Sequence, residues 1–301
     1  MTDIITYQQC PACSSAAISK VFSCKDETVS NEFFEIWQCS GCTLRFTQNV
    51  PGGQAIGPYY QSSDYVSHSD TKKGVINRLY HIVRNHTLKS KQALLDKLVG
   101  KPTATLLDAG AGTGAFAHTM QKHGWTVQGI EPDDNARKLA KDNYDLDLQT
   151  PENLGLMQTQ SFDVVTLWHV LEHVHDLHPY LDSFFRLLKQ DGTLVIAVPN
   201  YTCYDAAIYG NSWAAYDVPR HLYHFSPKSM DILLNKHGFV ITERKPMWFD
   251  SFYVSMLSEK HRANKGNIVK AFWNGLRSNV KAVADNNRCS SIIYVAKKID
   301  Q

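Results

Sequence analysis

The sequence predicts an α/β fold in which a mostly parallel sheet carries helices on both faces, preceded by a small cysteine-rich segment. Apolar segments of strand length alternate with helical segments from residue 105 onward. The stretch LLDAGAGTG at 106–114 joins one strand to one helix and has glycines at alternate positions. Two Cys-x2-Cys pairs lie within residues 1–50. A chain of 301 residues can form one or two domains with a sizeable core.

Composition narrows the function classes. The formal net charge of +2 gives no bulk electrostatic attraction for nucleic acid. No run approaches the eighteen or so apolar residues of a membrane-spanning helix, and the N-terminal MTDIITYQQCPAC lacks the pattern of a secretory signal. We therefore expect a cytoplasmic protein with no transmembrane segment.

The N-terminal cysteines predict a structural metal site. Cys10, Cys13, Cys39 and Cys42 form two Cys-x2-Cys pairs, and four thiolates can close a tetrahedral zinc site. Alternating patterns at 18–24 and 33–38 predict strands of a zinc-binding ribbon over 1–50. Such a short segment needs a stabilising metal ion or cross-link, because its own hydrophobic core is small. Disulfides and chance spacing are the alternatives, and a cytoplasmic setting argues against disulfides.

Residues 51–104 are predicted to be a linker followed by N-terminal helices. The stretch 51–71 is rich in Gly, Pro and Ser, and its Tyr59, Tyr60, Tyr65 and His68 either pack the linker onto the next domain or form a lid. Apolar residues at helical spacing predict a helix over 72–99, with a break near 85–87.

From residue 105 the periodicity predicts seven strands and four helices. The expected strands lie near 105–109, 125–130, 145–149, 162–168, 193–198, 239–244 and 291–297. The expected helices lie near 114–123, 133–142, 177–189 and 227–237. For the last of these, Ser226 supplies an N-cap, Pro227 suits the first turn and Gly238 ends it. A helical-looking insertion near 246–290 interrupts the final pair of strands; a cover or dimer surface, part of the acceptor pocket, and a membrane-surface contact are the alternatives.

The glycine-rich junction fits two kinds of cofactor. The spacing Gly110-x-Gly112-x-x-Ala115 satisfies a dinucleotide fingerprint, and Glu131 lies about twenty residues after the first glycine, where an acid binds ribose. However, Asp108 stands two residues before the first glycine, where dinucleotide-binding strands usually carry an apolar residue.

The downstream motifs favour the second kind of cofactor. PENL at 151–154, FDVVTLWHVLEHV at 162–174 and DGTLVIAVPN at 191–200 follow the glycine-rich junction in order. Together these segments resemble the class I S-adenosylmethionine (AdoMet) methyltransferases. The resemblance implies a Rossmann-like seven-stranded sheet over 105–301, with an antiparallel last strand between the fifth and sixth.

The same resemblance assigns the cofactor residues. Backbone at Gly110, Gly112 and Gly114 would approach the methionine part of AdoMet, and Asp108 would orient it through its ammonium or a water. Glu131 would bind the ribose and Asn153 would meet the adenine. Trp168 and His169 would close the fourth strand beside the cofactor.

The HVLEHV segment also has the His-x-x-Glu-His order of inverted zinc proteases, in His169, Glu172 and His173. Those enzymes carry the motif on a helix, whereas here it follows the apolar strand FDVVTLW. We therefore reject a catalytic metal at this motif.

The loop at 213–226, WAAYDVPRHLYHFS, holds the candidate catalytic residues. It follows the fifth strand, where α/β folds place substrate loops. With the cysteine pairs and the tyrosines after them, it resembles methyltransferases of sugar and polysaccharide gene clusters, including deoxysugar C-methyltransferases. The resemblance makes His221 the base, with His224 and Tyr223 as rivals. Arg220 replaces the family's acid and is expected to bind an anionic group of the acceptor.

These motifs lead to three hypotheses for function. The first is O- or C-methylation of a sugar or glycan-linked small molecule. Two departures from the deoxysugar enzymes weaken C-methylation: Arg220 in place of the acid, and no sign of their further C-terminal domain. The second is methylation of a quinone-like or phenolic small molecule, and the third is a non-catalytic AdoMet- or zinc-binding module. The first predicts a polar, open pocket around 213–224, and the second predicts an apolar one.

Overall fold

The protein is described by a computed structural model that covers residues 3–61, 75–101, 103–263 and 266–299. The chain divides into two compact units. The first unit comprises Met1–Tyr65, His169–Leu181 and Ile196–Tyr294, and the second comprises Val66–Trp168, Asp182–Val195 and Val295–Gln301. Each unit therefore combines segments that are distant in sequence. The domain boundaries predicted at residues 50 and 104 stay predictions.

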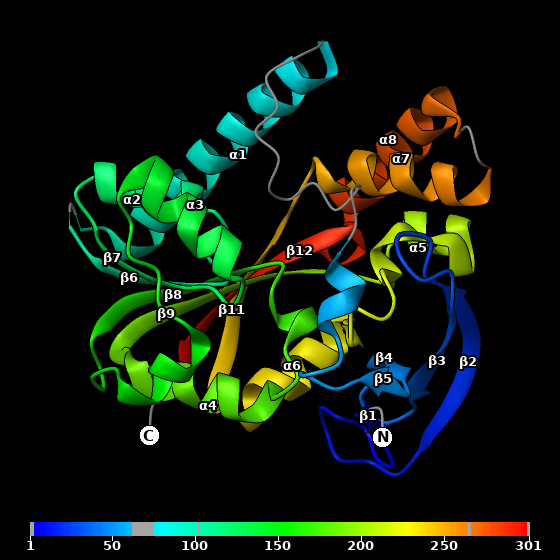
Figure 1. Ribbon diagram of the computed structural model, residues 1–301, viewed down its shortest axis with the longest axis horizontal. Helices are drawn as coiled ribbons and strands as arrows, with labels where there is room; N and C mark the ends of the chain where they lie inside the picture. The colour runs from blue at the N-terminus through cyan, green and yellow to red at the C-terminus, as the bar shows by residue number, and fades with distance from the viewer. Residues whose placement is uncertain (1–2, 62–74, 102, 264–265, 300–301) are drawn as a thin grey trace. The chain divides into compact units, whose positions relative to one another are not determined.

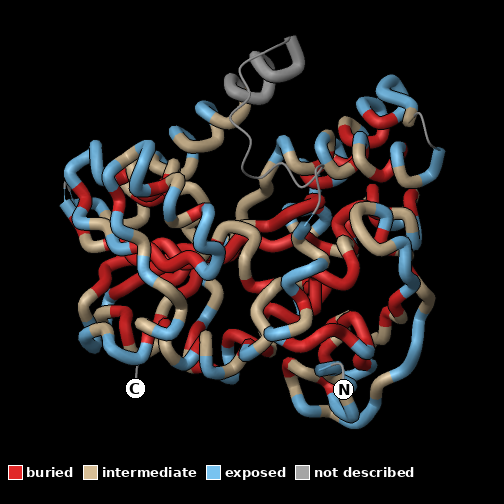
Figure 2. The backbone as a smooth tube through the Cα atoms, in the orientation of Figure 1, coloured by how far each residue is buried: buried red, intermediate tan, exposed pale blue. Residues whose placement is uncertain are grey.

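The main sheet has six strands in the order β11–β12–β9–β8–β6–β7 (Figure 1). Strand β6 pairs in parallel with both β7 and β8. The predicted α/β fold with a mostly parallel sheet is confirmed, and β12 lies between β9 and β11 as the resemblance implied. The strands are β6 (Thr105–Ala109), β7 (Thr126–Ile130), β8 (Phe162–Trp168), β9 (Leu188–Pro199), β11 (Phe239–Pro246) and β12 (Ser291–Lys298). Most residues of β6, β8, β9 and β12 are buried (Figure 2), whereas β11 buries only Phe239.

The structure corrects the prediction of a strand at 145–149. Asp145 caps the preceding helix in a left-handed conformation (φ 55°), and the Leu146 amide still donates to the Ala140 carbonyl. Because the segment stays tied to the helix end, only Gln149 forms a parallel bridge, with Ile130. Within the described residues the main sheet therefore has six strands instead of the predicted seven.

The helices of the second unit follow the predicted pattern. Helix α2 buries Phe116, Ala117 and Met120, the apolar side of its 3.6-residue period. The predicted break near 85–87 is wrong, since α1 runs through those residues. The elements are α1 (Val75–Val99), α2 (Ala115–Lys122), α3 (Asp134–Tyr144) and the 3-10 helix η2 (Pro151–Leu156); α4 (Leu177–Leu187) has residues in both units.

A four-stranded sheet in the first unit contains the predicted ribbon. Its order is β10–β4–β3–β2, so the strands expected at 18–24 and 33–38 are confirmed. Strand β10 comes from the 213–226 loop, and it pairs with β4 through Tyr223 opposite Phe46. The ribbon and that loop therefore share one sheet. The strands are β2 (Ile18–Lys25), β3 (Phe33–Cys39), β4 (Arg45–Gln48) and β10 (Tyr223–His224), with a separate pair β1 (Ile4–Ile5) and β5 (Val50–Pro51).

Helices complete the first unit. Helix α6 begins as predicted, because Ser226 caps it in a capping box with Ser229 and Pro227 occupies its first turn. Helices α7 and α8 fill the predicted insertion. The elements are η1 (Gly57–Tyr60), η3 (Leu171–His173), α5 (Tyr204–Tyr209), η4 (Gly210–Ser212), η5 (Ala214–Tyr216), α6 (Pro227–Lys236), α7 (Asp250–Arg262), α8 (Ile268–Ala284) and η6 (Asn286–Arg288).

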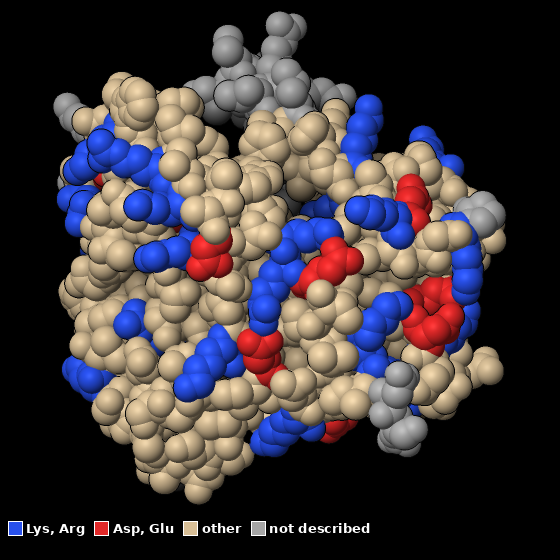
Figure 3. Space-filling view, turned by 180° about the vertical axis from the view of Figure 1, so that it is seen from behind, with Lys and Arg blue, Asp and Glu red and all other residues tan. Residues whose placement is uncertain are grey.

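Surface charge is mixed in sign. On the face drawn in Figure 3, acidic side chains are interspersed among the basic ones, and large areas carry neither. Among the described residues, no helix has the length and apolar character needed to cross a membrane.

Candidate functional site

The glycine loop, residues 110–114, joins β6 to α2. Gly112 has φ +54° and Gly114 has φ +79°, a region that favours glycine. A Cβ on Gly112 would meet no described atom within 4 Å, whereas a Cβ on Gly114 would lie 3.0 Å from Ala140 Cβ and from Leu146 Cδ1. Gly114 is therefore needed for packing as well as for its φ, and Gly112 leaves open space above the loop.

Glu131 stands at the end of β7 and holds the glycine loop. Its Oε2 accepts from the Gly112 amide (2.8 Å) and its Oε1 accepts from the Asp133 amide (3.0 Å). An ionised carboxylate has about four lone-pair sites. Glu131 thus stands at the end of the second strand of the fold, where an acidic residue binds ribose hydroxyls in cofactor-binding α/β folds.

Asp108 ends the buried part of β6. Thr166 Oγ1 donates to Asp108 Oδ1 (2.7 Å). Burial raises the pKa of Asp108 to about 6, although the Thr166 hydrogen bond and the charge of Lys91 act in the opposite direction. A buried carboxylate of this kind suits a cationic ligand group, which would stabilise its charged form.

Trp168 and Asn153 lie in the same unit as the glycine loop. The Trp168 ring lies edge-on to Phe116, with ring centroids 5.6 Å apart, and the Lys91 ammonium lies 4.2 Å from the Trp168 ring centroid. Trp168 Nε1 is buried with no hydrogen-bond partner in the described part of the chain. Asn153 lies on η2, where its Nδ2 faces Thr150 Oγ1 at 3.2 Å.

These residues fit AdoMet. The glycine loop leaves space where its backbone would approach the methionine part, and the Trp168 indole offers an unused donor. The Asp108 carboxylate would suit an ammonium, and Glu131 would suit ribose hydroxyls. The structure brings together in one unit every predicted cofactor residue except His169, which belongs to the first unit.

His169 directly follows β8 with a left-handed backbone (φ 58°), a conformation that is uncommon outside glycine but is enriched in Asn, Asp and His. Its Nε2 lies 3.0 Å from Asp250 Oδ2, and its Nδ1 lies 3.4 Å from Glu172 Oε1. Burial disfavours the charged ring, but the contacts with Asp250 and Glu172 outweigh this and raise the pKa of His169 to about 10. The two carboxylates therefore stabilise the charged form of the His169 ring.

Two further histidines lie beside Glu172. The rings of His173 and His221 pack edge to face, with their centroids 4.6 Å apart. One potential metal-ligating atom from each of Glu172, His173 and His221 lies within 4.8 Å of the others. Glu172 is fully buried, and neither of its oxygens accepts a hydrogen bond from the described residues, although His169 lies close by. Burial and the neighbouring His221 lower the pKa of His173 to about 4. By distance alone this trio could also accommodate a metal ion.

The tautomer of His221 follows from its partners. His221 Nδ1 lies 2.8 Å from the Ala215 carbonyl, which can only accept, so Nδ1 carries the hydrogen. In the neutral ring Nε2 is then the free acceptor, and it lies 4.0 Å from Asp217 Oδ2. This arrangement leaves Nε2 able to take up a proton next to a carboxylate.

The rival bases are placed differently. Thr47 Oγ1 donates to the His221 carbonyl (2.7 Å), so it accepts from His224 Nε2 (3.1 Å), and His224 Nδ1 is buried without a partner. Burial, with the nearby His221, holds the pKa of His224 well below its usual value. The Tyr223 hydroxyl lies 3.2 Å from the His175 carbonyl, and burial raises its pKa well above the usual range.

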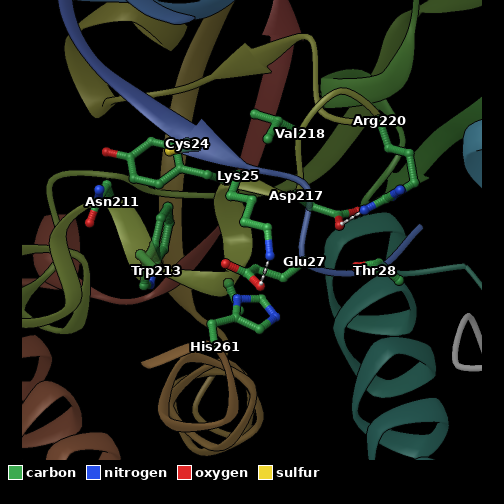
Figure 4. Close-up of a pocket in the computed structure, with 12 residues that line it drawn as sticks. Cys24, Lys25, Glu27, Thr28, Asn211, Trp213, Asp217, Val218, Arg220 and His261 are labelled. Atoms are coloured by element: carbon green, nitrogen blue, oxygen red, sulfur yellow. Dashed lines mark hydrogen bonds and ion pairs between the residues drawn. The ribbon is translucent and has the colours of Figure 1, made fainter. Parts of the chain in front are cut away.

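Arg220 corrects one expectation. Its guanidinium is fully buried and bonds to Asp217 on one side and to Asp26 Oδ1 (3.0 Å) on the other, and its Nη1 donates to the Tyr59 carbonyl (2.8 Å). Figure 4 shows the Arg220–Asp217 pair at the edge of a small pocket. The expectation that Arg220 binds an anionic acceptor group is wrong, because two carboxylates of the chain already hold it.

The four predicted metal ligands form a cluster. Cys10 Sγ lies 3.4 Å from Cys42 Sγ, Cys13 Sγ lies 3.6 Å from Cys39 Sγ, and all four sulfurs lie within 4.8 Å of one another. Both Cys-x2-Cys turns end in a residue of positive φ, Ser14 or Thr43, whose amide donates to the carbonyl of the first cysteine. None of the seven cysteines forms a disulfide.

Sequence reasoning missed Asp250 and Thr166 at these sites and assigned no role to Asp217. Asp250 reaches His169 from the insertion, Thr166 reaches Asp108 from β8, and Asp217 pairs with Arg220. Asp217 had a sequence signal, since it stands four residues before His221. Tyr60 also contributes, with its hydroxyl 3.1 Å from His173 Nδ1, whereas the predicted Tyr65 and His68 lie outside the described residues.

The chain was compared with known protein families and with individual proteins. Residues 81–244, more than half of the chain, match the profile of a methyltransferase domain. The ubiquinone biosynthesis O-methyltransferase of Xanthomonas oryzae pv. oryzae strain PXO99A is 32% identical over 131 residues, 40% of this chain and 55% of that protein. The enzyme of the same name from Actinobacillus pleuropneumoniae is 33% identical over 158 residues, 48% of this chain and 66% of that protein. The chain thus spans about half to two thirds of these relatives.

Solved structures agree on the fold. A Galdieria sulphuraria structure provisionally described as a sarcosine dimethylglycine methyltransferase has a TM-score of 0.51 and 15% identity, covering 74% of this chain and 88% of that one. A provisionally described methyltransferase of Bacillus halodurans has a TM-score of 0.50 and 16% identity, covering 70% of this chain and all of that one.

Proposed function

The chain belongs to the methyltransferase-domain family, and from that premise we propose that it transfers a methyl group from AdoMet to a hydroxylated aromatic small molecule. The observation that carries the cofactor half of this proposal is the glycine loop held by Glu131, with Asp108 and Trp168 in the same unit. Bound AdoMet supplies a methyl group already activated on a sulfonium. The remaining task of the protein is to hold the acceptor in line and to remove its proton.

His221 is the proposed base. Its Nε2 lone pair is left free by the Nδ1 contact with Ala215, and Asp217 would stabilise the imidazolium that forms. His224 and Tyr223 serve this role poorly, since the pKa of His224 is lowered and the pKa of Tyr223 is raised. As the acceptor oxygen gains the methyl carbon, the hydroxyl proton would pass to His221 Nε2.

Three considerations support a phenolic acceptor over a sugar. Nearly all side chains of the 213–224 loop are buried, including Trp213, Tyr216 and Leu222, so the loop does not form the polar, open pocket expected for a glycan. A phenolic hydroxyl also has a pKa near 10, well below the pKa of an alcohol and so closer to that of a histidine. Proton transfer from a phenol to a histidine therefore costs less than transfer from an alcohol. The names of the curated relatives point in the same direction.

We also propose that Cys10, Cys13, Cys39 and Cys42 hold a structural zinc ion. With a Zn–S distance of about 2.3 Å, a tetrahedral site places its sulfurs about 3.8 Å apart. The contacts of 3.4 and 3.6 Å within the cluster are close to that value. Four thiolates leave no open position on zinc, so its role would be to stabilise the ribbon.

Production of S-adenosylhomocysteine from AdoMet tests the acceptor class. The purified chain would be supplied with 4-hexylcatechol in one series and with a deoxysugar nucleotide in another. We expect turnover and a methyl ether with the catechol only. Turnover with the sugar nucleotide alone would restore the glycan hypothesis, and cofactor binding without turnover on either would favour the binding-module alternative.

A further inference from the structure

The helix pair α7–α8 turns small side chains inward and large apolar ones outward. The buried residues of α8 are Ala271, Asn274, Gly275, Ser278 and Ala282, and those of α7 are Ser251, Ser255, Ser258 and Glu259. An ordinary surface helix has the reverse pattern. The exposed residues that form what we call the apolar face are 45–75% accessible: Tyr253, Met256, Ile268, Val269, Phe272, Trp273, Val280 and Val283.

Buried polar contacts fix the rotation of α8. Ser278 Oγ donates to Asp205 Oδ1 (2.6 Å), and Asn274 Nδ2 donates to the Tyr209 hydroxyl (3.0 Å). A Cβ on Gly275 would lie 2.8 Å from Phe252 Cδ1 and 3.0 Å from Phe252 Cα, so the two helices touch at their backbones. Turning the apolar face inward would break buried hydrogen bonds and leave polar groups unpaired.

The exposed charge beside the apolar face is positive. Between residues 247 and 284 the sequence has six Lys or Arg and two acids. Both acids are matched within the fold, because Asp250 pairs with His169 and the buried Glu259 lies 3.5 Å from Lys270. Arg277 and Lys281, one turn apart, are exposed along the flank of the apolar face. A second copy docked on this face would oppose like charges, so the chemistry favours an anionic partner.

A groove beside α8 combines both features. It has a volume of about 460 Å³ and is lined by Tyr204, Trp273, Leu276, Arg277, Val280 and Lys281. Apolar and cationic side chains thus stand side by side within one concave surface. A lipid presents the complementary pair, an apolar chain joined to an anionic headgroup.

We propose that the apolar face of α7–α8 docks on a lipid bilayer that contains anionic phospholipids. A helix with aromatic and aliphatic residues on one face and Lys or Arg beside them lies in the plane of the interface, buried to the depth of the acyl boundary. Arg277 and Lys281 contact the headgroups, while Phe272 and Trp273 enter the acyl region. This docking goes beyond the proposed methyl transfer and requires neither cofactor nor acceptor.

Vesicle sedimentation tests the proposal with the full chain. We expect strong binding to vesicles of phosphatidylcholine with 30% phosphatidylglycerol, weak binding to phosphatidylcholine alone, and loss of binding in 0.5 M NaCl. Each basic residue near an anionic surface contributes about 1 kcal/mol, which is about fivefold in affinity. Arg277→Glu with Lys281→Glu should therefore weaken binding by about 25-fold or more, and Phe272→Ser with Trp273→Ser should weaken it comparably.

Matched controls separate this face from general stickiness and charge. Leu156→Ser removes another exposed apolar residue, and Lys122→Glu with Lys138→Glu makes the same charge change on α2 and α3. Both controls should bind like the wild type. Equal binding to the two kinds of vesicle, wild-type binding by the α8 variants, or a dimer that the Phe272 and Trp273 changes dissolve would each overturn the proposal.

Discussion

At His221, one backbone hydrogen bond decides which ring nitrogen can act. The Ala215 carbonyl fixes the hydrogen on Nδ1 and leaves Nε2 as the acceptor, facing Asp217. At His224 the same reasoning leaves Nδ1 buried and unpaired. Two histidines three positions apart in one loop therefore have different chemistry, which the sequence alone did not distinguish.

The first prediction concerns His221. We expect His221→Ala to lower kcat by about 10²–10⁴-fold, the usual contribution of a general base, with cofactor affinity nearly unchanged. His178→Ala is the control, because His178 pairs with His237 in the same unit. Rates should be measured by S-adenosylhomocysteine release. A His221→Ala enzyme with wild-type kcat would assign the loop to positioning alone.

A second prediction concerns pH and Asp108. Burial raises the pKa of Asp108 to about 6, and only the ionised carboxylate attracts an ammonium. AdoMet affinity should therefore be full at pH 7 and should fall as the pH drops through about 6. Calorimetry between pH 5 and 7 measures this, with Asp108→Asn as the control whose affinity is weak and flat. A wild-type affinity that is equal at pH 5 and pH 7 would exclude the ammonium contact.

At this scale the sequence predicts what is local. The glycine loop, Asp108 and the cysteine pairs are readable because their chemistry depends on spacing within one segment. Arg220 was misjudged because its partners Asp26 and Tyr59 come from segments some 160 or more residues away. Asp250 was missed for the same reason, since no pattern links it to His169.

At the scale of elements, the cysteine ribbon bears directly on the candidate base. Strand β4 of the ribbon pairs with β10, which begins two residues after His221. Thr47 of β4 also donates to the His221 carbonyl. The ribbon therefore has two structural roles: it forms its own small fold, and it holds the loop that carries the proposed base.

This support yields a third prediction. The wild type should carry about one zinc per chain, and Cys39→Ser should lose it together with most turnover, because the loop at 213–226 loosens. Its affinity for S-adenosylhomocysteine should stay near wild type, since the glycine loop and Glu131 belong to the other unit. Metal analysis and calorimetry measure the two effects. Cys24→Ala, a buried cysteine outside the cluster, is the control; full activity of a metal-free Cys39→Ser protein would refute the structural role.

Element prediction succeeded where periodicity was strong. The strands at 105–109 and 162–168 and the capped helix after Ser226 were readable because a buried face or a cap imposes a pattern. The prediction of a strand at 145–149 is wrong, because Leu146 packs in one cluster with Ala140 of α3, and Leu148 packs against that cluster. Which face of α8 is buried could not be predicted from the sequence either. Buried Asp205 and Tyr209 determine it through hydrogen bonds to α8, and both belong to a helix that is distant in sequence.

At the scale of the molecule, the two units divide the chemistry. The second unit holds the glycine loop, Asp108, Glu131 and Trp168, while the first holds the cysteine cluster and the histidines of HVLEHV and of the 213–226 loop. The sequence predicted consecutive domains. In the structure the first unit gathers three separate stretches of chain, and only tertiary contacts could show that.

The central claim is that the glycine loop and Glu131 bind AdoMet, and calorimetry with S-adenosylhomocysteine tests it most directly. Wild-type protein should bind this product with measurable affinity and should not bind a nicotinamide dinucleotide. Glu131→Ala removes the ribose acceptor and should weaken binding by about 1–3 kcal/mol. Gly112→Val places a branched side chain in the open space above the loop and should weaken it further. Unchanged affinity in both variants, or tight binding of the dinucleotide instead, would contradict the account.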